Sequence, residues 1–201
     1  MQWLSQYGYL IIVFIVLLAV FAFVFMKAVS AYSKHNKTYK AQEAELKRLT
    51  ALKEKYKNAT LDMLETYDES EISEGMALLY QIALQKNDDM EEAFRAMPKE
   101  KQYVYVLDVF TQDGSAGEFF TQNSEILTSI IVEALNAIGM TAFASELSAF
   151  AKMFDKDDEE VSYSTAAIEK FDKMMQEKDI LAKIKLTSSK YIKENYDILK
   201  C

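Results

Sequence analysis

Hydrophobic and polar positions divide the chain into one unbroken apolar stretch and a longer region with helical periodicity. Residues 9–26 read YLIIVFIVLLAVFAFVFM, eighteen apolar residues in succession, and no charged residue precedes Lys27. At about 1.5 Å per residue, the uncharged segment 7–26 makes a helix of roughly 30 Å, which matches the hydrocarbon core of a bilayer. The pattern therefore predicts a single N-terminal transmembrane helix over residues 9–29, after a short tail at residues 1–8.

Two other interpretations of the apolar stretch stay open. A buried helix of a soluble core is one, although such helices rarely run eighteen residues without a polar position. A signal peptide cleaved within residues 29–31 is the other, although no basic residue precedes the apolar stretch. A retained span is favoured by aromatic residues that suit a membrane interface and by the basic residues that follow, namely Trp3, Tyr7, Tyr9, Lys27 and Lys34.

The segment after the apolar stretch has the composition of a long helix. We expect a basic juxtamembrane stalk helix over residues 30–66, strongly helical from residue 38 onward. A dimerising coiled coil is one interpretation of this helix, but three of the eight heptad core positions counted from Tyr39 are polar, which disfavours it. A single helix that packs on its own domain is favoured, with apolar contacts from Leu46, Leu49, Leu52, Tyr56, Met63 and Leu64.

Residues 67–201 show the apolar spacing of a compact multi-helix domain. We expect helices over residues 72–86, 98–111, 125–138, 142–154 and 165–178, with a glycine-containing turn over 112–117. Residues 180–199 are expected to form one helix, either broken or continuous. Asn87 or Asp88 is a candidate N-cap, and Pro98 fits the first turn of the next helix. Because Val and Tyr are frequent in 98–111, a strand is the minor alternative there.

Composition supports an all-α protein. The 201 residues include only 5 Gly and 1 Pro, so few positions interrupt the helical pattern. A hydrophobic content of 50% is enough to build a core and argues against a disordered chain. The single cysteine, Cys201, excludes a disulfide within the chain and agrees with a reducing compartment.

Charge is distributed unevenly between the stalk and the domain. Residues 27–57 carry 9 basic and 3 acidic residues, which leaves 14 basic and 28 acidic residues in 58–201. The positive-inside rule therefore places the C-terminal domain in the cytoplasm, with a single-pass anchor in the cell (inner) membrane. The basic neck suits an anionic lipid surface, whereas the acidic domain argues against direct nucleic-acid binding.

Few residues carry recognisable catalytic chemistry. His35 is the only histidine and lies in the basic neck, so the sequence offers neither a catalytic triad nor a usual zinc ligand set in the domain. No glycine-rich phosphate loop is present. The acidic run 155–160 fails as an EF-hand because Glu160 and Ala166 occupy the positions of the required Gly and Glu. We therefore expect a non-enzymatic protein without a cofactor or metal; a carboxylate-based enzyme is the less favoured alternative.

Acidic residues gather in two segments of the domain. These segments predict an acidic interaction face that consists of Asp88, Asp89, Glu91, Glu92, Asp155, Asp157, Asp158, Glu159 and Glu160. A partner for such a face would itself be basic, as DNA-binding proteins are.

The region from Val104 to Phe154 resembles the DNA mimic protein 19 family. The family shares a glycine-containing turn, a Phe-Phe pair with an Asn soon after, and a helix that ends in Ala-Ile-Gly. The matching residues here are Gly114, Phe119, Phe120, Asn123, Ala137, Ile138 and Gly139. Ser115, Ala116 and Glu118 depart from the family pattern, which does not include a membrane span.

The resemblance implies an all-α, acidic, non-enzymatic domain in which the matched residues are structural. The named member of the family presents carboxylates where a DNA-binding protein expects phosphates. Together with the anchor, this implies a membrane-anchored interaction module that sequesters a nucleic-acid-binding or other basic protein through its acidic face. The alternative function is a structural component of a membrane complex that forms homo-oligomers through the stalk.

Overall fold

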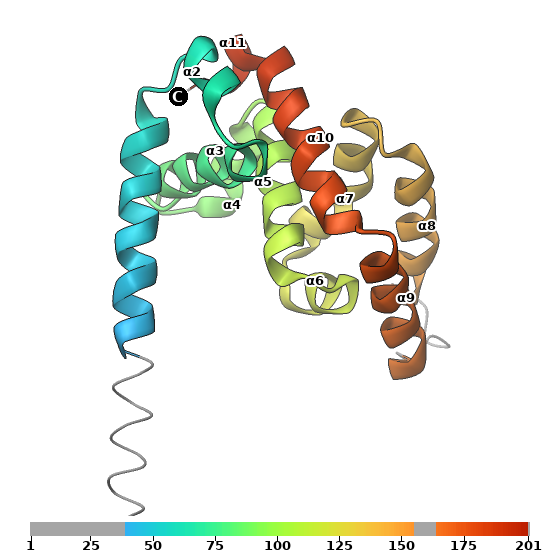
Figure 1. Cartoon of the computed structure of the whole chain (residues 1–201). Helices are drawn as coiled ribbons and strands as arrows, with labels where there is room; N and C mark the ends of the chain where they lie inside the picture. The colour runs from blue at the N-terminus through green and yellow to red at the C-terminus, as the bar shows by residue number, and fades with distance from the viewer. Residues whose placement is uncertain (1–38, 155–163, 201) are drawn as a thin grey trace, which may run out of the picture. The chain divides into compact units, whose positions relative to one another are not determined.

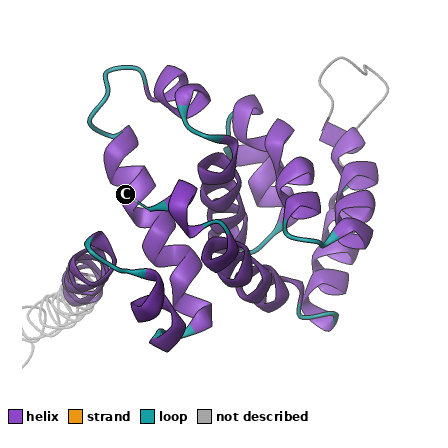
Figure 2. Cartoon of the chain, turned by 90° about the horizontal axis from the view of Figure 1, so that it is seen from above, coloured by secondary structure: helices purple, strands orange, loops and turns teal. Residues whose placement is uncertain are grey.

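The computed structural model describes residues 39–154 and 164–200 (Figure 1). Within these ranges the chain forms helices and turns and contains no strand (Figure 2). The all-α prediction is therefore confirmed for the described chain, and the strand alternative for 98–111 is wrong. The expected span over 9–29 and its flanking residues Trp3, Tyr7, Tyr9, Lys27 and Lys34 lie outside the described ranges. No helix that is described has the length and hydropathy needed to cross a membrane.

The chain divides into two compact units, Met1–Thr50 and Ala51–Cys201. Residues 39–50, the described part of the first unit, are helical throughout. Ion pairs within this helix join Lys47 to Glu43 at 2.7 Å and Arg48 to Glu45 at 2.8 Å. Such exposed pairs, one turn apart, stabilise a helix only slightly because solvent screens them.

The stalk expected over residues 30–66 is wrong in its C-terminal part. The helix ends at residue 57, and a separate short helix, α2 (Leu61–Thr66), follows after a break at 58–60. The side chain of Thr60 caps α2 by accepting a hydrogen bond from the Met63 amide at 3.4 Å. This polar residue therefore starts a new helix instead of continuing the old one.

Burial along this region separates the expected contacts into two groups. Leu52, Tyr56 and Leu64 are buried at 5%, 2% and 0% exposure, so the compact second unit begins well before residue 67. Met63 of the second unit remains exposed, so its expected packing on the domain is wrong. Leu46 belongs to the first unit and is 66% exposed.

Nine further helices make up the described part of the second unit, together with one 3₁₀ turn. The six expected helices are present with shifted ends, because caps and not periodicity set helix ends. The helices are α3 (Glu69–Leu84), α4 (Met90–Ala96), α5 (Lys99–Asp113), α6 (Ala116–Gln122), α7 (Glu125–Ala137), α8 (Thr141–Ala151), α9 (Thr165–Glu177), α10 (Ile180–Glu194) and α11 (Tyr196–Leu199), with the 3₁₀ turn at Lys152–Phe154. The short helices α4 and α6 are not among the six expected, and the helix expected over 180–199 is broken into α10 and α11.

Helix α5 is the central element of the second unit and contacts α3, α6, α7, α10 and α11 (Figure 1). Its Val104 belongs to an apolar cluster that includes residues of α3 and Ile192 of α10. Its Leu107 and Phe110 belong to a second cluster, to which α6, α7, α8, α9 and the first turns of α10 also contribute. Successive faces of α5 pack on different neighbours, which explains why apolar residues occur all round this helix.

Helix α6 was not expected, because Gly117 indicates a turn in the sequence. The Ser115 side chain caps α6 by accepting from the Glu118 amide at 3.2 Å. The same hydroxyl donates to Asp172 of α9 at 2.5 Å, and the Ala116 amide donates to that carboxylate at 2.9 Å. Asp172 therefore ties the start of α6 to α9 with two charge-assisted hydrogen bonds.

Candidate functional site

The four described residues of the expected acidic face lie around the first turn of α4. Asp88, Asp89, Glu91 and Glu92 are all exposed. Asp89 is the N-cap, since its side chain accepts from the Glu92 amide at 3.0 Å. Carboxylates at this position are favoured by the partial positive charge of a helix N-terminus. The remaining five residues, Asp155, Asp157, Asp158, Glu159 and Glu160, lie outside the described ranges.

Three of the four carboxylates have no structural task in the described chain. The side chains of Asp88, Glu91 and Glu92 form neither an ion pair nor a hydrogen bond with any other described residue. Capping thus accounts for Asp89 alone. The other three remain available to a partner in solution.

A groove adjoins this acidic turn and is enclosed by the end of α3, by α4, α5 and the start of α7. Its volume is about 350 Å³, and Gln81, Gln85, Glu91 and Ser124 supply its polar rim. Its apolar lining consists of Leu84, Met90, Phe94, Tyr105, Ile126 and Leu127. An apolar groove with few polar groups is the usual form of a binding site.

Two aromatic residues, Phe94 and Tyr105, form the floor of the groove, and a buried carboxylate lies near Tyr105. Phe94 is 4% exposed, and its ring centroid lies 5.7 Å from that of Tyr105. Burial raises the pKa of the Tyr105 hydroxyl above its usual value, and the charge of Asp108 raises it further. Asp108 is 4% exposed and accepts from the Gln112 amide group at 2.6 Å. The Tyr105 hydroxyl itself makes no hydrogen bond within the described chain.

A second, more polar cavity of about 550 Å³ has Ile126 in common with the lining of the groove. Arg95, Lys99 and Glu125 contribute its charged lining. The buried Gln102 amide donates to the carbonyls of Arg95 at 3.3 Å and Met97 at 2.9 Å. These bonds hold the C-terminal end of α4 against α5 and thereby position one wall of both cavities.

Next to the second cavity, three side chains form a hydrogen-bonded set between α5 and α7. Lys99 pairs with Glu133 at 2.8 Å, and the Tyr103 hydroxyl donates to the other oxygen of that carboxylate. The hydrogen bond from Lys99, followed by that from Tyr103, lowers the pKa of Glu133. Burial, followed by the bond to Glu133, raises the pKa of Tyr103. Lys99 is therefore already paired, whereas Arg95 forms no ion pair with a described residue.

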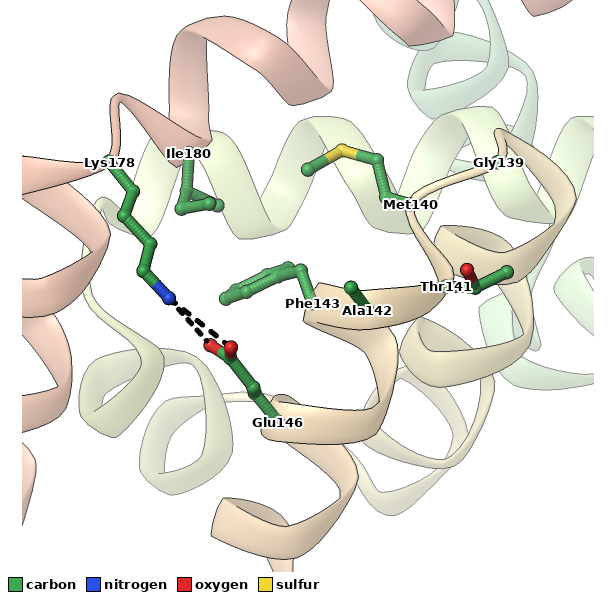
Figure 3. A pocket seen from close by; sticks show the side chains of 8 residues that line it. All are labelled: Gly139, Met140, Thr141, Ala142, Phe143, Glu146, Lys178 and Ile180. Atoms are coloured by element: carbon green, nitrogen blue, oxygen red, sulfur yellow. Dashed lines mark hydrogen bonds and ion pairs between the residues drawn. The ribbon is translucent and has the colours of Figure 1, made fainter.

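A pocket of about 260 Å³ lies on another side of the domain, at the start of α8. Figure 3 shows Lys178 and Glu146 reaching toward each other beside the apolar Phe143 and Ile180, with a separation of 3.2 Å. This ion pair accounts for both charged groups of the pocket. Across the described ranges, no cluster of side chains has the composition of a metal site.

The residues that carry the family resemblance form helix ends and part of the core. Gly114 and Gly139 have left-handed φ values of 71° and 81° and follow α5 and α7. Asn123 ends α6, since its amide donates to the Phe119 carbonyl at 3.0 Å and to Asp113 at 2.7 Å. Ala137 is exposed, whereas Ile138 is 8% exposed and belongs to the core.

The Phe-Phe pair opens a chain of aromatic contacts between α6, α8 and α9. Phe119 is fully buried, and its ring contacts Phe110 at 5.2 Å and Phe120 at 5.4 Å between centroids. Phe120 stacks on Phe154 at 5.3 Å, and Phe150 stacks on Phe171 at 4.2 Å. These contacts assign the Phe pair to packing and not to a surface site.

The comparisons with known proteins add no relative: no family model, curated protein or solved structure matches this chain. The resemblance to the DNA mimic protein 19 family therefore stays a prediction.

Sequence reasoning located the acidic turn but missed the groove beside it. The apolar residues Met90, Ile126 and Leu127 at the starts of α4 and α7 were the available indication. Nothing in the sequence pairs those two helix starts, because Met90 and Glu125 are 35 positions apart and α5 and α6 intervene.

Proposed function

We propose that this protein is a membrane-anchored, non-enzymatic interaction module whose acidic surface binds a basic protein partner. The observation that carries the proposal is the group of exposed carboxylates Asp88, Glu91 and Glu92, which have no partner in the described chain. The excess of 14 acidic residues over basic residues in 58–201 strengthens the attraction to a basic partner. The apolar stretch over residues 9–26 supplies the anchor.

Sequestration of a nucleic-acid-binding protein is the sharper form of this proposal, and the family resemblance motivates it. A protein that recognises DNA presents Lys and Arg side chains to phosphates. Carboxylates on a rigid helical surface can occupy the same side chains. A partner held in this way would be released by double-stranded DNA and by salt.

The proposal is tested by crosslinked affinity capture of the full chain from its own membranes. The variant Asp88→Asn/Glu91→Gln/Glu92→Gln removes the three charges and keeps the Asp89 cap. We expect it to lose the partner that wild type captures, and we expect added double-stranded DNA to release that partner from wild type.

A matched control removes three exposed carboxylates elsewhere, in the variant Glu118→Gln/Glu169→Gln/Glu194→Gln. Its net charge equals that of the test variant, so it should keep the partner if the surface around α4 is specific. Equal capture by the wild type and both variants would refute the proposed surface. Release by salt but not by DNA would refute the mimicry alone.

A structural role through the stalk is the second candidate, and one observation favours it. Tyr39 and Leu46 lie one heptad apart on the helix and are 60% and 66% exposed. A second copy of the stalk could cover both side chains in a coiled coil. Crosslinking in membranes that yields only monomers would refute this role, and the variant Leu46→Lys should abolish any dimer observed.

A further inference from the structure

We infer that the groove beside α4 docks an amphipathic helix of the basic partner, with apolar side chains in the groove and Lys or Arg against the adjoining carboxylates. The inference rests on the proposed function and deepens it, because it names the structural class of the partner segment. Helix-in-groove binding of this kind depends on apolar anchors one turn apart and on charges that flank them.

The apolar half of the site is formed by residues that face one another across the groove. Met90 and Phe94 lie one helical turn apart on α4, and Ile126 and Leu127 lie on the first turn of α7. Met90 is 56% exposed although it borders the buried Phe94 ring. A flexible thioether at the mouth of an aromatic-floored groove can adapt to an incoming side chain.

The electrostatic half of the site determines which occupant fits. Glu91 lines the groove, Asp88 and Glu92 adjoin it, and Asp108 is buried near Tyr105 of its floor. All four are acidic, so positive charge in a partner is favoured at this end. A second copy docked groove to groove would bring these like charges together, which disfavours a symmetric dimer.

A second, polar cavity of about 550 Å³ shares Ile126 with the groove. Its charged lining mixes both signs, from Arg95, Lys99 and Glu125, so it adds no net preference for either charge. The choice of occupant therefore depends on the apolar lining and the adjoining carboxylates, which fit a helix with Lys or Arg beside its apolar face. The Tyr105 hydroxyl offers such a segment a hydrogen bond.

The test uses the full chain in nanodiscs of zwitterionic lipid and a labelled helical peptide of about five turns. The peptide carries leucine on one face and lysine on the other, and fluorescence anisotropy reports its binding after subtraction of empty nanodiscs. Two matched peptides replace lysine by glutamate or leucine by serine. We expect each replacement to weaken binding at least tenfold, since both halves of the site are needed.

The groove variant Met90→Ser/Ile126→Ser separates the inference from the proposed function. We expect it to weaken binding of the leucine–lysine peptide at least tenfold while its unfolding midpoint stays near that of wild type. The control Leu186→Ser/Ile198→Ser makes the same kind of replacement at two exposed apolar side chains outside the groove, at 41% and 46% exposure. It should bind like the wild type.

Each other outcome is decisive. Unchanged binding by the groove variant, with loss in the Asp88→Asn/Glu91→Gln/Glu92→Gln variant, would overturn the inference and leave the proposed function standing. Unchanged binding by both variants, or equal binding of the glutamate peptide, would overturn the inference and the acidic surface together. A wild-type dimer in mass photometry that Met90→Ser/Ile126→Ser dissolves would assign the groove to a second copy and overturn the inference.

Discussion

Replacing Gly75 by alanine should destabilise the domain, although alanine is the better helix former. Gly75 lies inside α3, and a Cβ atom there would be 2.3 Å from Cδ2 of Tyr56 and 2.5 Å from Cγ and Cε2. Tyr56 is 2% exposed, and its ring packs edge-on against Tyr67 with a centroid separation of 5.3 Å. Because Cγ lies near the backbone, the ring cannot avoid the new methyl by a rotation of its outer end.

The expected loss follows from two opposing effects. In an exposed helix, Gly→Ala would stabilise by about 1 kcal/mol. Overpacking of a filled core costs about 1–3 kcal/mol, occasionally more, and three contacts below 3 Å place Gly75 at the upper end. We expect a net loss of about 2 kcal/mol, which lowers the melting temperature of a domain of this size by about 4–8 °C.

The assay is thermal and urea unfolding of the full chain, followed by circular dichroism. Gln81→Ala, an exposed change in the same helix, should stay within about 0.5 kcal/mol of wild type. The double variant Gly75→Ala/Tyr56→Leu should lose less than the sum of the single losses, since the shorter side chain relieves the clash. A Gly75→Ala protein as stable as wild type would refute the reasoning.

Three further changes test other parts of the fold. Gly139→Ala should lower the free energy of unfolding by about 1–2 kcal/mol in urea, because alanine is strained at the Gly139 φ of 81°. No steric clash adds to this loss, since no atom lies within 4 Å of the new Cβ. Gly139→Asn should cost less, since asparagine tolerates the left-handed region better. Asp172→Ala should cost about 1.5–3 kcal/mol in the same assay by removing the acceptor for Ser115 and Ala116, and a neutral result would contradict this tie. In carboxyl NMR titrations Glu133 should titrate below its usual pKa. Its contribution to stability is therefore present above its pKa in the unfolded chain and is lost as pH falls through its pKa in the folded chain. Lys99→Met should raise the pKa of Glu133 in the folded chain, and an unchanged pKa would contradict the role of Lys99.

The glycines show why a correct local pattern can lead to a wrong local structure. Gly114 and Gly139 occupy left-handed positions after helices, as a glycine at a helix end suggests. Gly117 also suggests a turn, yet it lies inside α6, where a Cβ atom would be 2.5 Å from Cγ2 of Ile168. Gly75 and Gly117 thus permit close approach between segments distant in sequence, which local propensity does not report.

The acidic turn and its groove differ in the same way. The sequence identified the acidic residues Asp88, Asp89, Glu91 and Glu92, because acids near a helix start are a local feature. Its N-cap candidates, Asn87 and Asp88, were wrong, since Asp89 is the N-cap. Whether a carboxylate caps a helix or remains available depends on geometry, and of the four acidic residues only Asp89 accepts a backbone amide hydrogen bond. The apolar groove arises because Gln102 holds the end of α4 against α5 while α7 packs along α5.

By itself, the sequence determined that the domain is helical and where most of its helices lie, because a period of 3.6 residues and polar caps act within one or two turns. It also predicted the apolar span over 9–29, which depends on composition alone. Only the tertiary structure decided that residues 52–64 belong to the compact domain, that α5 packs on all sides, and that α4 and α7 enclose a groove. These features depend on contacts between residues far apart in the chain, and such contacts are selected by the fit of whole helix faces and not by local periodicity.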